Sequence, residues 1–301
     1  SELGAIFAMQ GFAGLILFSV FVLMALGLAI IFGQMGVINM AHGEFMILGA
    51  YVTYLVSNAF AAYVPALFGA YFFVAMVLAF CASGLLGMVV EWAIIRHLYK
   101  RPLDTLLATW GLSLMLQQAF RSLFGAREVG VTIPDWMMGS LAVTDMIEVP
   151  INGIFVMVLA LGISAAIYVM MYRSGWGRQV RAVTQNRVMA GAVGINTERT
   201  DRMTFGIGCG VAGVAGAAFT MIGSTGPTSG QAYIVDTFLV VVFGGAASLL
   251  GTIASAFSIS QAQSILEFFL SGSMAKVITL LVVVGILMLR PQVLFAMKLR
   301  K

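Results

Sequence analysis

The sequence predicts an all-α, polytopic membrane protein with about eight or nine transmembrane or re-entrant helices. Of its 301 residues, 61% are hydrophobic and only 9% are charged, whereas an average soluble domain carries roughly 25% charged residues. Long apolar runs interrupted by glycine favour helices as the spanning elements, because a helix satisfies its own backbone groups in lipid. The short alternating strands of a membrane β-barrel are not evident.

Nine segments are candidates for spanning helices, which need about 20 residues each, although some of the nine are shorter. They cover residues 12–33, 44–60, 66–92, 104–124, 152–172, 203–223, 233–248, 250–270 and 274–290. The regions 39–60 and 233–270 could contain re-entrant pieces in place of full crossings. The longest hydrophilic piece, 172–202, is too short to fold alone. We therefore expect one membrane domain over residues 1–301.

Basic residues gather in three clusters, and cytoplasmic loops of membrane proteins carry an excess of such residues. The clusters are Arg96, Lys100 and Arg101; then Arg173, Arg178, Arg181, Arg187, Arg199 and Arg202; then Arg290, Lys298, Arg300 and Lys301. The loop 125–151 is mainly acidic and is predicted to lie on the outer face. This alternation predicts a cytoplasmic C-terminus and an N-terminus on the outer face.

The stretch Gly33–Tyr51 interrupts an apolar run with Asn39, His42 and Glu44. Ionisable groups between hydrophobic segments are costly to desolvate and are usually functional. Asn39 is a good N-cap, and a helix that starts there would place Asn39 and His42 on one face and Glu44 on the opposite one. We expect Asn39 and His42 to line a path through the membrane and Glu44 to hold the bundle. Equally, all three could be hydrogen-bonding residues that fix the helices together.

Two further segments carry polar groups within apolar surroundings. Thr109, Ser113, Gln117 and Gln118 form a stripe near helical spacing, which suits an uncharged polar solute but would also join helices to one another. Asp236 stands in an apolar run, where its carboxylate either lines the path or pairs with a helix end. The predicted path residues are therefore Asn39, His42, Thr109, Gln117, Gln118 and Asp236.

The basic segment 173–202 is predicted to contain a short helix. Asn186 has the character of an N-cap and Gly194 that of a C-terminal stop, which leaves a helix at about 187–193. Val188 and Met189 give this helix an apolar side. Such a helix could lie on anionic headgroups or dock in a groove of a soluble partner.

Several signatures of enzymes are absent from the sequence. None of its four lysines follows a glycine, so there is no P-loop GxxxxGK[ST] with which to bind ATP. There is also no metal-ligand cluster, nucleophile elbow or cofactor fingerprint. We expect no catalytic residues, no metal site and no cofactor in this chain.

Three motifs resemble the permease subunits of branched-chain amino acid type ABC importers. They are GVINMAHGEF at 36–45, GRQVRAVTQNRVMAGAVGIN at 177–196 and RPQVLFAMK at 290–298. Within that group, RPLDTLLATWGLSLMLQQ at 101–118 and GPTSGQAYIVDTFLVVVFGG at 226–245 look most like the permease of urea ABC transporters. The resemblance covers nearly the whole chain.

The resemblance implies the ABC importer permease fold, in a bacterial inner (plasma) membrane. It also implies four kinds of partner: a second, homologous permease in a heterodimer, two cytoplasmic ATPase subunits that carry ATP and Mg, a periplasmic or extracellular solute-binding protein, and membrane lipid, with no nucleic acid. The segment 173–202 would then be the element that couples the permease to an ATPase. The coupling residues implied are Gly177, Arg178, Arg181, Asn186, Ala190 and Gly194.

The function expected from these observations is passage of urea delivered by an external binding protein, driven by ATP hydrolysis on separate subunits. Urea is neutral, so its passage would need hydrogen-bonding groups such as Asn39, Thr109, Gln117 and Gln118. An importer of branched-chain amino acids or short amides is the near alternative. A passive urea or amide channel and a purely structural membrane scaffold are alternatives of other classes.

Overall fold

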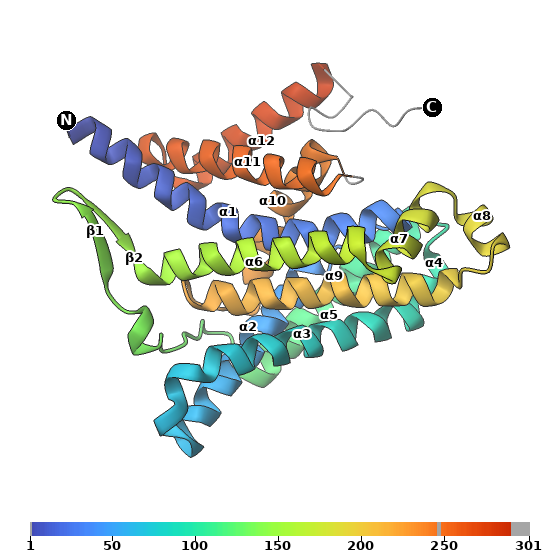
Figure 1. Ribbon diagram of the computed structural model, residues 1–301, viewed down its shortest axis with the longest axis horizontal. Helices are drawn as coiled ribbons and strands as arrows, with labels where there is room; N and C mark the ends of the chain where they lie inside the picture. Colours follow the sequence, from blue (N-terminus) through green and yellow to red (C-terminus); the bar gives the residue numbers. More distant parts are fainter. Residues whose placement is uncertain (1, 246–247, 290–301) are drawn as a thin grey trace.

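The computed structural model describes residues 2–245 and 248–289, and its main body is a bundle of helices (Figure 1). Within the described residues, seven helical segments are long and apolar enough to cross a membrane. They are Glu2–Met35, His42–Tyr63, Pro65–Leu98, Ile151–Arg173, Thr197–Thr220, Leu249–Phe269 and Gly272–Leu289. The prediction of a polytopic helical membrane protein is confirmed.

The elements follow one another in an order close to that predicted. The first half contains α1 (Glu2–Met35), α2 (His42–Tyr63), η1 (Pro65–Ala70), α3 (Tyr71–Val90), the π-helical turn η2 (Glu91–Ile95), α4 (Arg96–Leu98) and α5 (Pro102–Phe124). An outer segment follows, with η3 (Asp135–Met137), β1 (Ser140–Thr144) and β2 (Ile147–Pro150). The second half contains α6 (Ile151–Arg173), α7 (Gly175–Gln185), α8 (Arg187–Ala192), α9 (Thr197–Thr220), α10 (Ser229–Gly244), α11 (Leu249–Phe269) and α12 (Gly272–Leu289).

Helix α9 lies at the centre of the bundle, and 18 of its 24 residues are buried. Its glycines allow neighbouring backbones to approach closely, as small residues do in membrane helix pairs. A Cβ atom at Gly216 would lie 1.8 Å from the carbonyl oxygen of Met46 in α2, and one at Gly208 would lie 2.8 Å from the carbonyl oxygen of Gly27 in α1. Helices α1, α2 and α3 all pack on α9 in this way, so α9 fixes their positions.

Between α1 and α2 the chain leaves the helical conformation at the exposed Gly36 and then turns back into the protein, where Val37, Asn39 and Ala41 are buried. Helix α1 ends at Met35, Gly36 has a positive φ of 66°, and α2 begins only at His42. The Nε2 atom of His42 lies 3.0 Å from the carbonyl oxygen of Met24. Met24 lies about 16 Å back along α1 from Met35, at 1.5 Å per residue. The non-helical segment 36–41, which we call the buried break, therefore returns into the bundle, where neighbouring helices must satisfy its backbone.

The prediction that a helix begins at Asn39 is wrong by three residues. The side-chain oxygen of Asn39 accepts a hydrogen bond from the backbone N–H of Ala41 at 3.0 Å, and the Thr109 hydroxyl accepts one from Met40 N–H at 3.2 Å. Local side-chain bonds of this kind compete with the helical pattern. They hold the chain in a turn until His42.

The other predicted spans correspond to helices, with shifted ends. Helix α10 is a short apolar helix of 16 residues that ends at Gly244, and Gly245 has a positive φ of 85°. The region 233–270 is thus divided between α10 and α11. Helix α5 occupies the predicted span 104–124 but is not among the seven segments above. The C-terminal basic cluster and the motif at 290–298 lie outside the described residues.

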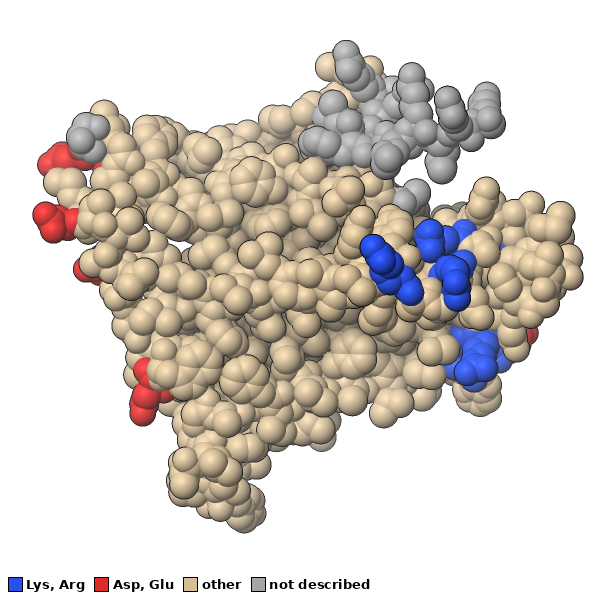
Figure 2. Space-filling model, in the orientation of Figure 1, with Lys and Arg blue, Asp and Glu red and all other residues tan. Residues whose placement is uncertain are grey.

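The two ends of the bundle differ in charge. The N-terminus lies at the same end as the β1–β2 hairpin, and α7 and α8 lie at the opposite end (Figure 1). On the face drawn in Figure 2, lysine and arginine gather at the end with α7 and α8, and most of the acidic residues at the end with the hairpin. The hairpin, whose strands pair antiparallel, was not predicted by the sequence analysis.

Candidate functional site

The buried break holds the first of the predicted path residues, Asn39. Its side chain is completely buried, and its Oδ1 atom closes the turn to Ala41. Its Nδ2 donor has no hydrogen-bond partner among the described residues. A buried amide donor without a partner costs about 1–3 kcal/mol. Asn39 therefore presents a buried donor that has no partner among the described residues.

His42 lies one turn further on, as the first residue of α2. It is also completely buried. Its Nε2 atom contacts the Met24 carbonyl oxygen on α1, and its Nδ1 atom has no partner among the described residues. The next residue, Gly43, packs against Gly230 at the start of α10, where a Cβ atom at Gly43 would lie 2.4 Å from the Gly230 carbonyl oxygen. The N-terminal ends of α2 and α10 therefore meet beside His42.

Helix α5 supplies the other polar groups of this region. Gln117 donates a hydrogen bond from Nε2 to a Glu44 carboxylate oxygen at 2.9 Å and lies 3.3 Å from the Ser113 hydroxyl. The Thr109 hydroxyl lies 3.4 Å from the carbonyl oxygen of Ile38 in the buried break. Glu44 was predicted to lie apart from the path and to hold the bundle. It does join α2 to α5, but through Gln117, which was itself predicted to line the path.

Two of the predicted path residues lie elsewhere. Gln118 is exposed on the surface of α5, whereas its neighbour Gln117 is buried. Asp236 on α10 forms an ion pair with Lys276 on α12 at 3.5 Å. Pairing with a helix end was the predicted alternative for Asp236, whereas its partner in the structure is a lysine side chain. Thr109 thus lies against the buried break and Gln117 against Glu44, both from α5, whereas His42 contacts α1. We call Asn39, His42, Glu44, Thr109 and Gln117, which lie at the break or contact it and the start of α2, the polar cluster.

The segment 173–202 contains α7, α8 and the start of α9, and of these α8 is the short helix that was predicted. Asn186 caps α8 by accepting a hydrogen bond from Met189 N–H at 3.0 Å, and Gly194 has the positive φ of a C-terminal stop, 96°. Helix α7 was missed: it is short and basic, but its buried Val180 and Val183 follow helical spacing and Ser174 caps it. Its Gly177 packs against backbone carbonyl oxygens at the end of α6, with no room for a Cβ atom.

The remaining predicted coupling residues take different positions in this segment. Arg178 and Arg181 are exposed on α7, and the Arg181 guanidinium lies 5.2 Å from the centre of the Tyr172 ring. Ala190 is buried in α8. On the outer side of α8, Val188 is 84% exposed and Met189 58% exposed. Because apolar side chains in a polar segment favour burial, α8 presents an apolar surface that is suited to a partner.

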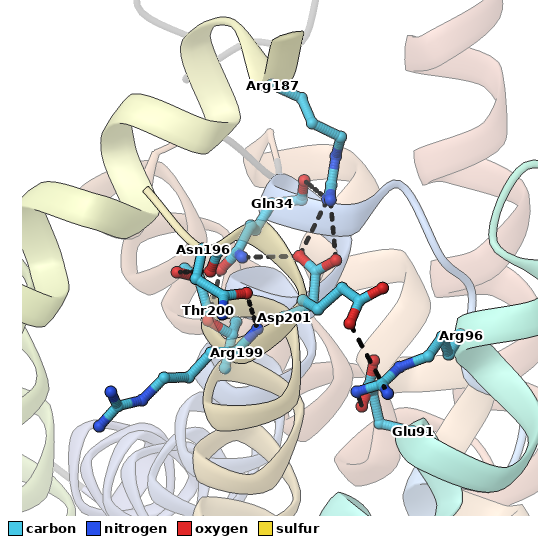
Figure 3. A network of polar contacts seen from close by, with 10 residues as sticks. Gln34, Glu91, Arg96, Arg187, Asn196, Arg199, Thr200 and Asp201 are labelled. Atoms are coloured by element: carbon cyan, nitrogen blue, oxygen red, sulfur yellow. Dashed lines mark hydrogen bonds and ion pairs between the residues drawn. The ribbon is translucent and has the colours of Figure 1, made fainter. Parts of the chain in front are cut away.

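Figure 3 shows a polar network beside α8 that the sequence analysis missed. Arg187 donates two hydrogen bonds to the carboxylate of Asp201, at 2.7 and 2.9 Å. These bonds raise the pKa of the Arg187 guanidinium above its ordinary value. Gln34 at the end of α1 donates to the same carboxylate at 2.9 Å. The sequence signalled this network only by a polar residue near the end of each of three helices: Gln34 in α1, Arg187 in α8 and Asp201 in α9.

A second ion-pair group adjoins this network. Glu91 in the π-helical turn is buried, and its carboxylate lies 3.5 Å from Arg96 and 3.7 Å from Arg202. Arg96 also lies 3.8 Å from Glu198. π-Helical turns often occur at functional sites. Among residues 2–245 and 248–289, no group of three or more His, Cys, Asp or Glu residues could hold a metal ion.

The sequence of this chain matches a known family. The family described as "Branched-chain amino acid transport system / permease component" matches residues 11–288. No solved structure was found to match the chain.

Curated relatives match over almost their whole length. The chain is 28% identical over 310 residues to the high-affinity branched-chain amino acid transport system permease protein LivH of Escherichia coli K12. That alignment covers 97% of this chain and 96% of the relative. It is 27% identical over 300 residues to LivH of Salmonella typhimurium, with the same coverage. It is 27% identical over 295 residues to the permease protein BraD of Pseudomonas aeruginosa, which covers 92% of each chain. These relatives are named for branched-chain amino acids and not for urea.

Proposed function

Because this chain belongs to the permease family of branched-chain amino acid transport systems, we propose that it is a membrane subunit of an ATP-driven importer of a small polar solute. The observation that carries the proposal is the pairing of two features in one bundle. One is the buried polar cluster at the break before α2, and the other is the exposed apolar surface of α8 at the basic end. The first would contact solute, and the second would bind an ATPase.

The proposed assembly contains a second permease, two ATPase subunits and a solute-binding protein. The ATPase subunits would supply ATP and Mg at the basic end, which we place in the cytoplasm, in line with the distribution of basic residues in membrane proteins. The binding protein would dock at the end that holds the β1–β2 hairpin. The membrane is then the bacterial inner membrane.

For the substrate, we propose a branched-chain amino acid first, since the names of the matched family and relatives support it. The buried N-terminal end of α2, with its positive dipole, would favour the substrate carboxylate. Urea remains a second candidate, because Asn39, Thr109 and Gln117 are uncharged hydrogen-bonding groups that suit a neutral solute.

Uptake by the complete importer would separate these substrates. The permease, its sister subunit, the ATPases and the binding protein are reconstituted in liposomes with ATP inside, and radiolabelled leucine or urea is offered outside. We expect ATP-dependent leucine uptake. Urea uptake without leucine uptake would reverse the order of the two candidates, and rapid urea flux without ATPases would favour the passive channel.

The surface of α8 provides a direct test of ATPase binding. Replacing Val188 and Met189 together with aspartate puts two charges on the apolar surface that we assign to the partner. Charges without partners in a buried interface cost several kcal/mol, so we expect at least a tenfold loss of co-purified ATPase. Val143→Asp is the matched control, because Val143 is 55% exposed on β1 at the opposite end. Undiminished co-purification of the double variant would contradict the docking assignment.

A further inference from the structure

One side chain of α8 points away from the exposed apolar surface and into the bundle. Arg187 is the first residue of α8, directly after the cap Asn186. Its guanidinium donates hydrogen bonds to both carboxylate oxygens of Asp201 on α9, at 2.7 and 2.9 Å (Figure 3). Bidentate pairs of this kind are strong and fix geometry as well as distance. This pair therefore ties the start of α8 to α9 in a defined geometry.

Gln34, near the end of α1, also bonds to Asp201 and Arg187. The Gln34 side chain donates from Nε2 to Asp201 at 2.9 Å and accepts a hydrogen bond at Oε1 from the Thr204 hydroxyl. Its backbone carbonyl oxygen accepts a third bond from Arg187, at 3.5 Å. Both polar atoms of the Gln34 side chain thus have a partner. Gln34 is 6% exposed and Asp201 5% exposed, so water competes little for these bonds.

Gln34 lies next to the buried break, so movement of Gln34 can reach the break. Gln34 stands two residues before Gly36, whose positive φ begins the buried break. A displacement of Gln34 would therefore reach Asn39 and His42 through a few non-helical residues. Because backbone outside regular helices can change its φ and ψ angles, the buried break can take up a second conformation when Gln34 moves.

Other groups keep Arg187 in place. Its guanidinium lies 5.1 Å from the centre of the Tyr99 ring, between α4 and α5. The nearby pairs of Glu91 with Arg96 and Arg202 tie the π-helical turn to α9 beside the same contact. The chain thus links α8, α9, α1 and the end of the α3 segment at one place.

We propose that the contact of Arg187 with Asp201 and Gln34 transmits movement of α8 to the buried break, and that these three are positioning residues for transport. This inference rests on the proposed function. When an ATPase moves α8, Arg187 would carry Asp201 and Gln34 with it, and the start of α2 would move relative to α10. Breaking the contact would leave the ATPase bound and active but disconnected from the polar cluster.

The test uses the complete importer carrying Asp201→Asn or Arg187→Gln. Asp201→Asn keeps the shape of the side chain but removes its charge. We expect uptake per ATP hydrolysed to fall at least tenfold, while the ATPases co-purify and hydrolyse ATP as before. Because both changes act on one contact, the double variant should lose no more than either single variant. Arg199→Gln is the matched control, since Arg199 lies in the same segment, is exposed and points away from the network (Figure 3).

A second measurement separates transmission from support of the fold. Ala41→Cys is introduced into a chain whose exposed Cys81 is replaced by alanine, and its labelling by a thiol reagent is followed before and after vanadate traps the ATPases. We expect trapping to change the labelling rate with Asp201 present and to leave it unchanged with Asp201→Asn.

Two results would overturn the inference. One is unchanged uptake per ATP in a well-assembled Asp201→Asn importer. The other is loss of ATPase co-purification in that variant, which would make the contact a support for docking only. If the unmodified chain fails to co-purify with ATPases, that result contradicts the proposed function itself and not only the role of this contact.

Discussion

Replacing Gly216 with alanine is expected to lower the melting temperature of the purified protein by roughly 2–12 °C. The added Cβ atom would lie 1.8 Å from the Met46 carbonyl oxygen and 2.9 Å from the Ala50 backbone nitrogen. Since both are backbone atoms, α2 would have to move away from α9. Overpacking of this kind costs about 1–3 kcal/mol and occasionally more, and each kcal/mol corresponds to about 2–4 °C in a domain of this size class.

The matched control for this change is Gly162→Ala in α6. A Cβ atom at Gly162 meets nothing within 4 Å, and alanine favours a helix over glycine by about 1 kcal/mol. We expect its melting temperature to be unchanged or slightly higher, as measured by thermal unfolding in detergent. Equal melting temperatures for the two variants would mean that α2 does not pack on α9 at this point.

Replacing Asn39 with leucine is expected to reduce substrate uptake by the complete importer at least tenfold while the subunits still assemble. Leucine is similar in size, but it removes the buried Nδ2 donor that we assign to the solute. It also removes the acceptor that closes the turn to Ala41. Asn39→Asp separates these two roles, because aspartate retains the acceptor and loses the donor.

If the donor serves the solute, Asn39→Asp loses uptake as Asn39→Leu does. Thr279→Val is the control, since the buried Thr279 hydroxyl bonds to Ala275 within its own helix. Normal uptake by Asn39→Leu, measured with radiolabelled substrate in liposomes, would remove Asn39 from the path.

Much of the helical framework could be predicted from the sequence, because apolar length decides which segments enter lipid. The short helix at 187–193 could also be predicted, since Asn186 and Gly194 carry local signals for its two ends. Helix α7 was missed although the sequence held signals for it: Ser174 as an N-cap, and Trp176, Val180 and Val183 at helical spacing. The start of α2 was misplaced because Thr109, from a distant part of the chain, binds the backbone of Met40.

The polar cluster could be predicted as a set of residue types but not as a set of contacts. The bond between Glu44 and Gln117 joins α2 to α5, and it depends on how those two helices cross. The exposed position of Gln118 depends on the rotation of α5, which the stripe of polar residues left open. The pairing of Arg187 with Asp201 was likewise hidden among the other arginines of its segment.

The buried break also has a consequence for the exchange of its amide hydrogens with solvent. Non-helical segments usually exchange quickly, because water reaches their N–H groups. Here the Met40 N–H is bonded to Thr109 on α5, and the Ala41 N–H to the buried side chain of Asn39. The Met40 amide hydrogen is therefore protected while its bond to Thr109 persists. Its exchange rate measures how often this contact between α5 and the buried break opens.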